Sequence, residues 1–120
     1  KKQRSFEHLN KVGNGGFSLR NVHKHIEICK KQTERIAENI KKRPENNYHI
    51  EDVFWSIQVP QLYPDFRIPE YKEALNFAFD RKPKLAFKLN NNMYPFACHG
   101  FNKPKVFSFW KTKIEALKVL

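Results

Sequence analysis

The chain has 120 residues, a mass of 14.4 kDa and a net charge of +11, a length for one domain or part of one. Its 40% hydrophobic and 14% aromatic residues provide a modest core and argue against intrinsic disorder. No apolar run approaches the ~18 residues of a membrane-spanning helix. Two cysteines are too few for a disulfide framework or a zinc knuckle. We expect Cys29 and Cys98 to be reduced and mostly buried, which favours a cytoplasmic compartment.

The charge is distributed unevenly along the chain. Residues 1–43 carry 12 basic and 4 acidic side chains, residues 44–80 carry 2 and 7, and residues 81–120 carry 9 and 1. This layout suits a site for a phosphorylated small molecule that keeps a carboxylate for chemistry. A nucleic-acid-binding face usually keeps carboxylates away from its basic charge. The alternatives are a merely solvated basic surface and attraction to an anionic membrane surface.

The first half of the chain predicts one long helix and one short helix. A glycine-rich extended stretch over residues 12–17 precedes a helix that Ser18 caps and that runs to about residue 43. Its apolar side chains recur every three or four residues, and Pro44 ends it. A short helix is expected over residues 51–58, halted before Pro60.

The second half predicts two helices around short extended segments. A helix opens at residues 68–70 and carries an apolar stripe to Phe79. Residues 84–88 alternate like a strand, residues 94–99 form a second extended segment, and residues 110–120 form a closing helix. The strands are too few for the helices to cover as a self-contained α/β domain. We therefore expect the C-terminal portion of a larger α/β domain.

Residues 13–20 form the first motif, Gly-Asn-Gly-Gly-Phe-Ser-Leu-Arg. Glycines ahead of a helix let the backbone approach a ligand closely, and the positive end of the helix favours an anion. The motif is neither a Walker loop nor the Gly-x-Gly-x-x-Gly fingerprint. A purely structural turn is the alternative.

Glu51 and Asp52 form the second motif, set against the apolar residues 53–55. A partly desolvated carboxylate at this position makes a better general base. Acidic residues also occur at helix starts as simple caps, which is the alternative. The third motif is Pro-Phe-Ala-Cys-His-Gly over residues 95–100, in which His99 suits a metal or a phosphate, or serves only as an ordinary surface or core histidine.

In this order, the three motifs resemble the signature of a domain family whose members are described as candidate glycosyltransferases, over roughly residues 12–103. The order is also similar to the C-terminal half of GT-A transferases of the Fringe and galactosyltransferase types. The resemblance implies an α/β, Rossmann-related fold portion, helix-rich with few short strands, in which residues 1–120 form the acceptor and catalytic-base half. It implies sugar transfer from a nucleotide-sugar donor to a glycan or another hydroxyl acceptor.

The resemblance also implies roles for the residues of the glycine-rich motif. Gly15 and Gly16 would line the cleft between donor and acceptor. Asn14, Ser18 and Arg20 match the motif and belong to the same donor-binding segment, without a separate role for each.

The later motifs acquire catalytic roles by the same resemblance. Asp52 would be the general base that deprotonates the acceptor hydroxyl in an inverting transfer. Glu51 would orient that base or bind the acceptor. His99 would ligate Mn²⁺ or Mg²⁺ on the donor diphosphate, where a divalent ion neutralises the leaving group.

One departure concerns the Asp-x-Asp motif of GT-A enzymes. The three aspartates, Asp52, Asp65 and Asp80, lie 13 and 15 positions apart, so the motif is absent from this sequence. We therefore expect the chain to be inactive, or nearly so, without a donor-binding half. The alternatives are a basic nucleic-acid-binding module that stacks bases on aromatic rings, and a non-catalytic binding domain on the same scaffold. The transferase hypothesis expects no nucleic-acid partner and a location in the cytoplasm or at a membrane surface.

Overall fold

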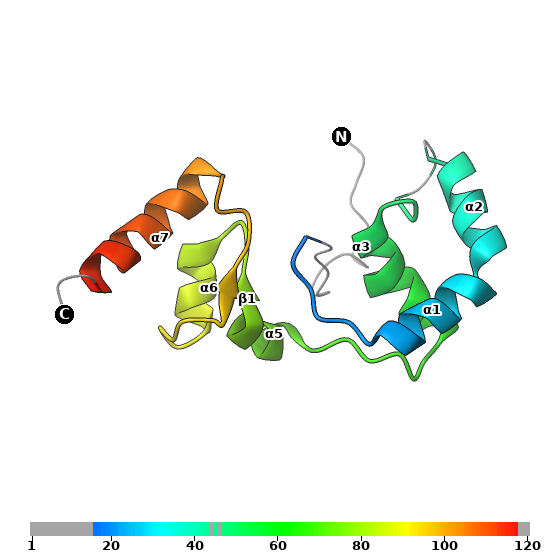
Figure 1. The fold of residues 1–120 in the computed structure, drawn as a ribbon, viewed down its shortest axis with the longest axis horizontal. Helices are drawn as coiled ribbons and strands as arrows, with labels where there is room; N and C mark the ends of the chain where they lie inside the picture. The colour runs from blue at the N-terminus through cyan, green and yellow to red at the C-terminus, as the bar shows by residue number, and fades with distance from the viewer. Residues whose placement is uncertain (1–15, 44, 46, 118–120) are drawn as a thin grey trace. The chain divides into compact units, whose positions relative to one another are not determined.

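The computed structural model describes residues 16–43, 45 and 47–117 (Figure 1). The extended stretch expected over residues 12–17 therefore lies almost wholly outside the described residues. The chain divides into two compact units, Lys1–Ile68 and Pro69–Leu120. In the described part of the chain, no helix combines the length and the apolar character needed to cross a membrane.

The first unit begins with two helices where the sequence predicted one. α1 (Val22–Lys31) and α2 (Thr33–Lys41) are separated at Gln32, whose φ of −111° and ψ of 18° leave the helical region. The Gln32 side chain donates a hydrogen bond to the Tyr63 hydroxyl at 2.8 Å. The Thr33 hydroxyl donates to the Cys29 and Lys30 main-chain carbonyls of α1, a back-bonding pattern that bends helices.

The cap of α1 also differs from the prediction. Asn21, not Ser18, caps the helix by accepting a hydrogen bond from the Lys24 main-chain N–H at 3.0 Å. Asparagine is among the best N-cap residues because its side-chain oxygen reaches a free N–H of the first turn. The segment from residue 18 to residue 21 is therefore irregular rather than helical.

A continuous helical segment carries the acidic pair. It consists of α3 (Glu51–Val53), the π-helical turn η2 (Phe54–Gln58) and α4 (Val59–Leu62). The expected stop before Pro60 is wrong. The Val59 N–H bonds to the Phe54 carbonyl five residues back, so Pro60 falls in the first turn of α4, where a proline is tolerated.

The core of the first unit lies between α1 and this helical segment. Ile28, Phe54 and Val59 are buried there, and Ile36, Trp55, Tyr63 and Phe66 surround them. Each large apolar side chain buried in this way contributes about 1.5–3 kcal/mol.

A buried polar pair accompanies this core. The Asn39 side chain of α2 donates a hydrogen bond to the Gln58 side-chain oxygen at 2.7 Å, and both residues are buried. The bond satisfies two groups that water cannot reach and connects α2 to η2.

The second unit is built on a two-stranded parallel sheet. α5 (Tyr71–Phe77) leads directly into β1 (Ala78–Phe79), which pairs with β2 (Ala97–Cys98) so that Phe79 lies opposite Cys98. α6 (Pro83–Leu89) lies on the connection between the strands, and α7 (Pro104–Leu117) closes the unit (Figure 1). Parallel strands need such a crossover, because a tight hairpin turn joins only antiparallel ones.

Three expectations for the second unit are corrected by the structure. Residues 84–88 are helical rather than a strand, because Pro83 starts α6 and the two inner side chains, Ala86 and Phe87, pack together against the core. That core consists of Phe79, Val106, Phe109 and Trp110. The preceding helix stops at Phe77 to give β1, and α7 begins at Pro104, six residues before the expected start.

The two cysteines lie in different environments. Both are free, as expected, but Cys29 is exposed, so the prediction of a buried thiol is wrong for it. The adjacent Ile28 takes the inward position of α1 instead. Cys98 is half-buried in β2, and this burial raises the pKa of its thiol. The extended segment expected over residues 94–99 is confirmed at β2, and the described chain is helix-rich with few short strands, as predicted.

Candidate functional site

The glycine-rich motif is described in part. Gly16 lies in a turn, and Ser18 and Arg20 lie in the irregular stretch before α1. Asn14 and Gly15 lie outside the described residues. The Ser18 hydroxyl accepts a hydrogen bond from Arg20 Nε at 2.9 Å, so these two motif side chains hold one another.

Arg20 joins the glycine-rich motif to the acidic pair. Its guanidinium forms an ion pair with the Glu51 carboxylate at the start of α3. The two side chains are 29% and 52% exposed, so solvent screens the pair and its contribution to stability is small. The main effect of the ion pair is therefore to hold two motifs together that lie 31 residues apart in the sequence.

Asp52 occupies the second position of α3 and is partly shielded from water. Its Oδ1 atom is fully buried and has no hydrogen-bond partner among the described residues. Its main-chain carbonyl accepts a hydrogen bond from the Ser56 hydroxyl one turn later. A buried acceptor without a donor costs about 1–3 kcal/mol and calls for an explanation, of which a ligand's hydroxyl is one.

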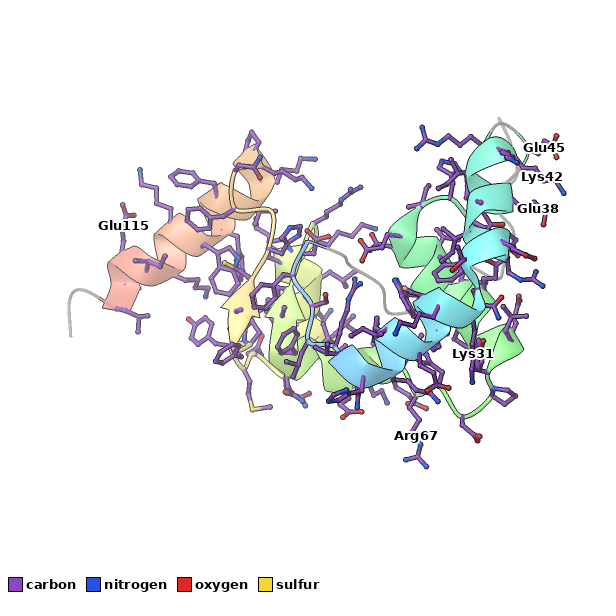
Figure 2. The ribbon with its side chains drawn as sticks, turned by 45° about the vertical axis from the view of Figure 1, so that its right-hand side comes forward. Lys31, Glu38, Lys42, Glu45, Arg67 and Glu115 are labelled. Carbon is purple, nitrogen blue, oxygen red and sulfur yellow. The ribbon has the colours of Figure 1, made fainter. Side chains whose placement is uncertain are left out.

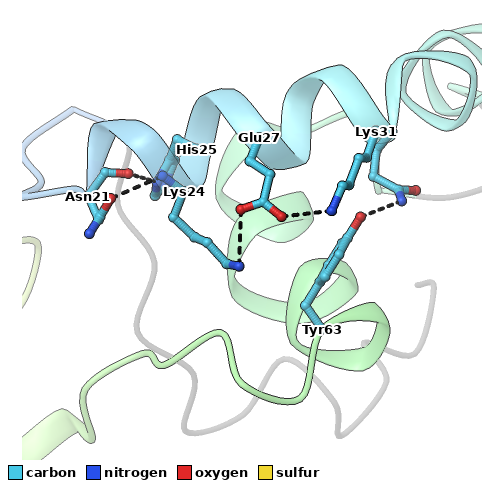
Figure 3. A network of polar contacts seen from close by, with 7 residues as sticks. Asn21, Lys24, His25, Glu27, Lys31 and Tyr63 are labelled. Atoms are coloured by element: carbon cyan, nitrogen blue, oxygen red, sulfur yellow. Dashed lines mark hydrogen bonds and ion pairs between the residues drawn. The ribbon is translucent and has the colours of Figure 1, made fainter.

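Sequence analysis missed an aromatic cluster beside the acidic pair. The centroid of the His25 ring lies 4.0 Å from that of Trp55 and 5.6 Å from that of Phe66. The ring centroids of Trp55 and Phe66 are 5.8 Å apart. His25 Nδ1 also lies 2.9 Å from the Asn21 main-chain oxygen, in the cap of α1 (Figure 3). Only Trp55, which adjoins the acidic motif in sequence, offered a signal for this cluster.

An ion-pair network on α1 accounts for part of the basic charge of the first unit. The Glu27 carboxylate accepts hydrogen bonds from Lys31 Nζ at 2.8 Å and from Lys24 Nζ at 3.2 Å (Figure 3). These hydrogen bonds, Lys31 first, hold the pKa of Glu27 below its ordinary value of 4.5. Lys42 and Glu38 form a similar pair on α2, and their side chains extend away from the ribbon (Figure 2). These three lysines are therefore paired with glutamates of their own helices.

His99 lies in the second unit, where the structure pairs it with Asp80. Asp80 directly follows β1 and His99 directly follows β2, so both stand at the carboxyl ends of the parallel strands. His99 Nδ1 lies 3.3 Å from Asp80 Oδ1, and both side chains are about one-third exposed. This edge is the usual position of ligand sites in α/β sheets. Sequence analysis missed Asp80, although its place directly after an apolar run was a weak signal.

Gly100 is required beside this pair. Its φ of +70° is a conformation that other residues adopt only with strain, and a Cβ there would lie 3.1 Å from Asp80 Oδ1. The glycine of the third motif therefore lets the backbone turn close to the aspartate carboxylate.

Asp80 and His99 together offer a carboxylate and an imidazole to a divalent metal. The described residues contain no group of three or more His, Cys, Asp or Glu side chains that could hold a metal ion. Mg²⁺ often binds through one or two carboxylates together with substrate phosphates and water, and Mn²⁺ accepts similar oxygen ligands. The pair therefore fits the protein's share of a site that a phosphorylated substrate completes.

Comparison with known proteins gives one match. A family model described as a protein of unknown function, DUF5672, matches residues 1–99. No curated protein and no solved structure matches the chain. The matched range includes the first two sequence motifs and the third as far as His99, so that only Gly100 of the three motifs lies outside it.

Proposed function

The chain belongs to the DUF5672 family of proteins of unknown function, and from this premise we propose that it is the acceptor-side, catalytic-base part of a GT-A-type glycosyltransferase. The reaction is metal-assisted transfer of a sugar from a nucleotide-sugar donor to a glycan or another hydroxyl acceptor. The observation that carries the proposal is Asp52, whose buried Oδ1 has no hydrogen-bond partner among the described residues. It stands beside Glu51, which Arg20 holds in place.

In this proposal, Asp52 takes the proton of the acceptor hydroxyl. The freed electron pair of the acceptor oxygen forms a bond to the anomeric carbon of the sugar. The bond from that carbon to the diphosphate breaks at the same time, and its electron pair leaves with the nucleoside diphosphate. A carboxylate positioned at the acceptor hydroxyl can take this proton as a general base. Glu51 and Arg20 orient the turn that carries the base.

Asp80 and His99 are the residues that we propose hold Mn²⁺ or Mg²⁺. A bound divalent ion would offset the negative charge that develops on the leaving diphosphate. His99 Nδ1 and Asp80 Oδ1 lie 3.3 Å apart, a separation at which one divalent ion can contact both atoms. Gly100 lets the backbone turn close to the Asp80 carboxylate without a Cβ that would crowd it.

The test uses the complete protein that contains this chain, with a panel of nucleotide sugars and hydroxyl acceptors. Asp52→Asn should lower turnover by about 10²–10⁴-fold, the usual contribution of a positioned general base, with an unchanged melting temperature. Asp65→Asn is the matched control, because Asp65 is an exposed aspartate of the same unit, and it should keep its turnover. Near wild-type turnover in Asp52→Asn would refute the role of the base.

A separate variant tests the metal assignment. His99→Ala should shift the Mn²⁺ activation curve to higher concentrations, because one ligand is lost. An activation curve that coincides with that of the wild type would remove His99 from the metal site, whatever the result for Asp52.

A further inference from the structure

We propose that a basic pocket in the second unit binds a soluble phosphate ester. The pocket has a volume of about 580 Å³ and lies between the first residues of α6 and those of α7. Four cationic side chains line it: Arg81, Lys82, Lys84 and Lys105. None of these residues belongs to the three sequence motifs, and the proposed transfer does not use them.

The charge of the pocket is not balanced by acidic groups. No aspartate or glutamate is among its lining residues. Lys82, Lys84 and Lys105 form no ion pair with any residue that the structure describes, in contrast to the lysines of α1 and α2. Arg81 has only a distant contact, 3.9 Å, from its Nε to Asp80 Oδ2. Cations gathered around a concave wall raise the local potential and concentrate anions there.

The composition of the wall favours a phosphate group over a single carboxylate. Lysine and arginine are the side chains that proteins use for phosphate oxygens, and four of them match a group with two or more negative charges. The Ser108 hydroxyl adds a neutral donor at the start of α7. Pro83, Leu85 and Pro104 supply an apolar side to the same pocket, against which an organic group can pack.

The size of the pocket indicates a small molecule. A volume of about 580 Å³ lies within the ~300–1,000 Å³ typical of small-molecule sites and exceeds what a lone phosphate fills. A concave site of this size suits a free phosphate ester better than the broad surface of a membrane. We therefore assign the ligand to the class of organic mono- or diphosphates.

Binding to this pocket can be measured without any transfer reaction. Calorimetric titration of the chain with inorganic pyrophosphate and with adenosine diphosphate, at an ionic strength of about 0.15 M and without metal, should give saturable binding. The triple variant Lys82→Gln/Lys84→Gln/Lys105→Gln should bind at least about tenfold more weakly, because each exposed charge contact is worth roughly a two- to fivefold change. Backbone amide shifts should be confined to residues 81, 82, 84 and 85 and to residues 105–108.

A second triple variant controls for net charge. Lys72→Gln/Lys88→Gln/Lys111→Gln removes the same charge from exposed lysines of the same unit that do not line the pocket. It should stay within about threefold of the wild-type affinity, since charges beyond a Debye length are largely screened. Equal losses in the two triple variants would overturn the proposal, because the effect would then belong to overall charge.

Two further outcomes would also overturn it. One is the absence of saturable pyrophosphate binding by the wild type. The other is binding of phosphatidylglycerol vesicles without any binding of pyrophosphate, which would make the surface a membrane contact. Retained pyrophosphate binding together with no effect of Asp52→Asn on turnover would contradict the proposed transferase function alone, so the two proposals fail separately.

Discussion

The buried hydrogen bond between Asn39 and Gln58 allows a quantitative test of how the first unit is held together. Asn39→Leu removes the donor and leaves the Gln58 oxygen buried without a partner. Gln58→Met removes the acceptor and leaves the Asn39 amide unpaired. An unsatisfied buried polar group costs about 1–3 kcal/mol, so each single variant should lose about that much stability.

The double variant separates the hydrogen bond from the packing. Asn39→Leu/Gln58→Met places two apolar side chains of similar size face to face, an exchange that is often nearly neutral. The two single losses should therefore not add, and the coupling energy should approach their sum, about 2–6 kcal/mol when each single loss is about 1–3 kcal/mol. The stability of the double variant should lie within about 1 kcal/mol of the wild type, since the exchange leaves no buried polar atom without a partner.

Urea unfolding followed by tryptophan fluorescence measures these energies. Trp110→Phe in the background leaves Trp55 as the sole tryptophan, so the signal reports the first unit. Slopes that match across the four proteins would show that the unfolded ensembles are comparable. Single losses that add to within about 0.5 kcal/mol would refute the reasoning, because additivity is the behaviour of groups that do not interact.

The other predictions concern the third motif and the surface of α1. Gly100→Ala should lower the free energy of unfolding by about 1–2 kcal/mol, the cost of a left-handed backbone at a residue with a Cβ. Gly100→Asn should lose less, because asparagine adopts this backbone conformation more readily. Equal losses of the two variants in urea titrations would contradict a backbone origin. Because Lys31 and a second lysine depress the pKa of Glu27, its stabilising contribution should be present above pH 4.5 and disappear as the pH falls through the lower pKa of the folded state. Circular dichroism melts should therefore place Glu27→Gln below the wild type at pH 7, with the difference vanishing in acid.

The sequence predicted well where local signals agreed with tertiary packing. The amphipathic pattern of α1 and α2 and the helix after Pro69 were readable because apolar spacing, proline placement and charge pointed the same way. The break at Gln32 was not readable, because it depends on a hydrogen bond to Tyr63 from a distant segment. The alternation over residues 84–88 was misleading, since Pro83 and the packing of the inner side chains favour a helix.

The candidate site also combines residues that local motifs identify with residues that only the tertiary structure brings together. Arg20, Glu51 and Asp52 were singled out from local motifs, and the structure brings the first two into contact. Asp80 was missed because its position beside His99 depends on the pairing of β1 with β2, which no local pattern specifies. The basic pocket was missed for a related reason: its cations come from the starts of two helices that are far apart in sequence.

The π-helical turn η2 contains one residue more than a regular α-helical turn, and this extra residue sets the orientation of the acidic pair. Phe54 and Val59 are five positions apart, a separation that places side chains about 140° apart in a regular α-helix, yet both belong to the same buried cluster. The extra residue of the turn makes this common direction possible. Deleting one residue between them would allow regular α-helical bonding and rotate α3 by about 100° against α4. The direction in which Asp52 projects therefore depends on the number of residues in this turn as well as on their identity.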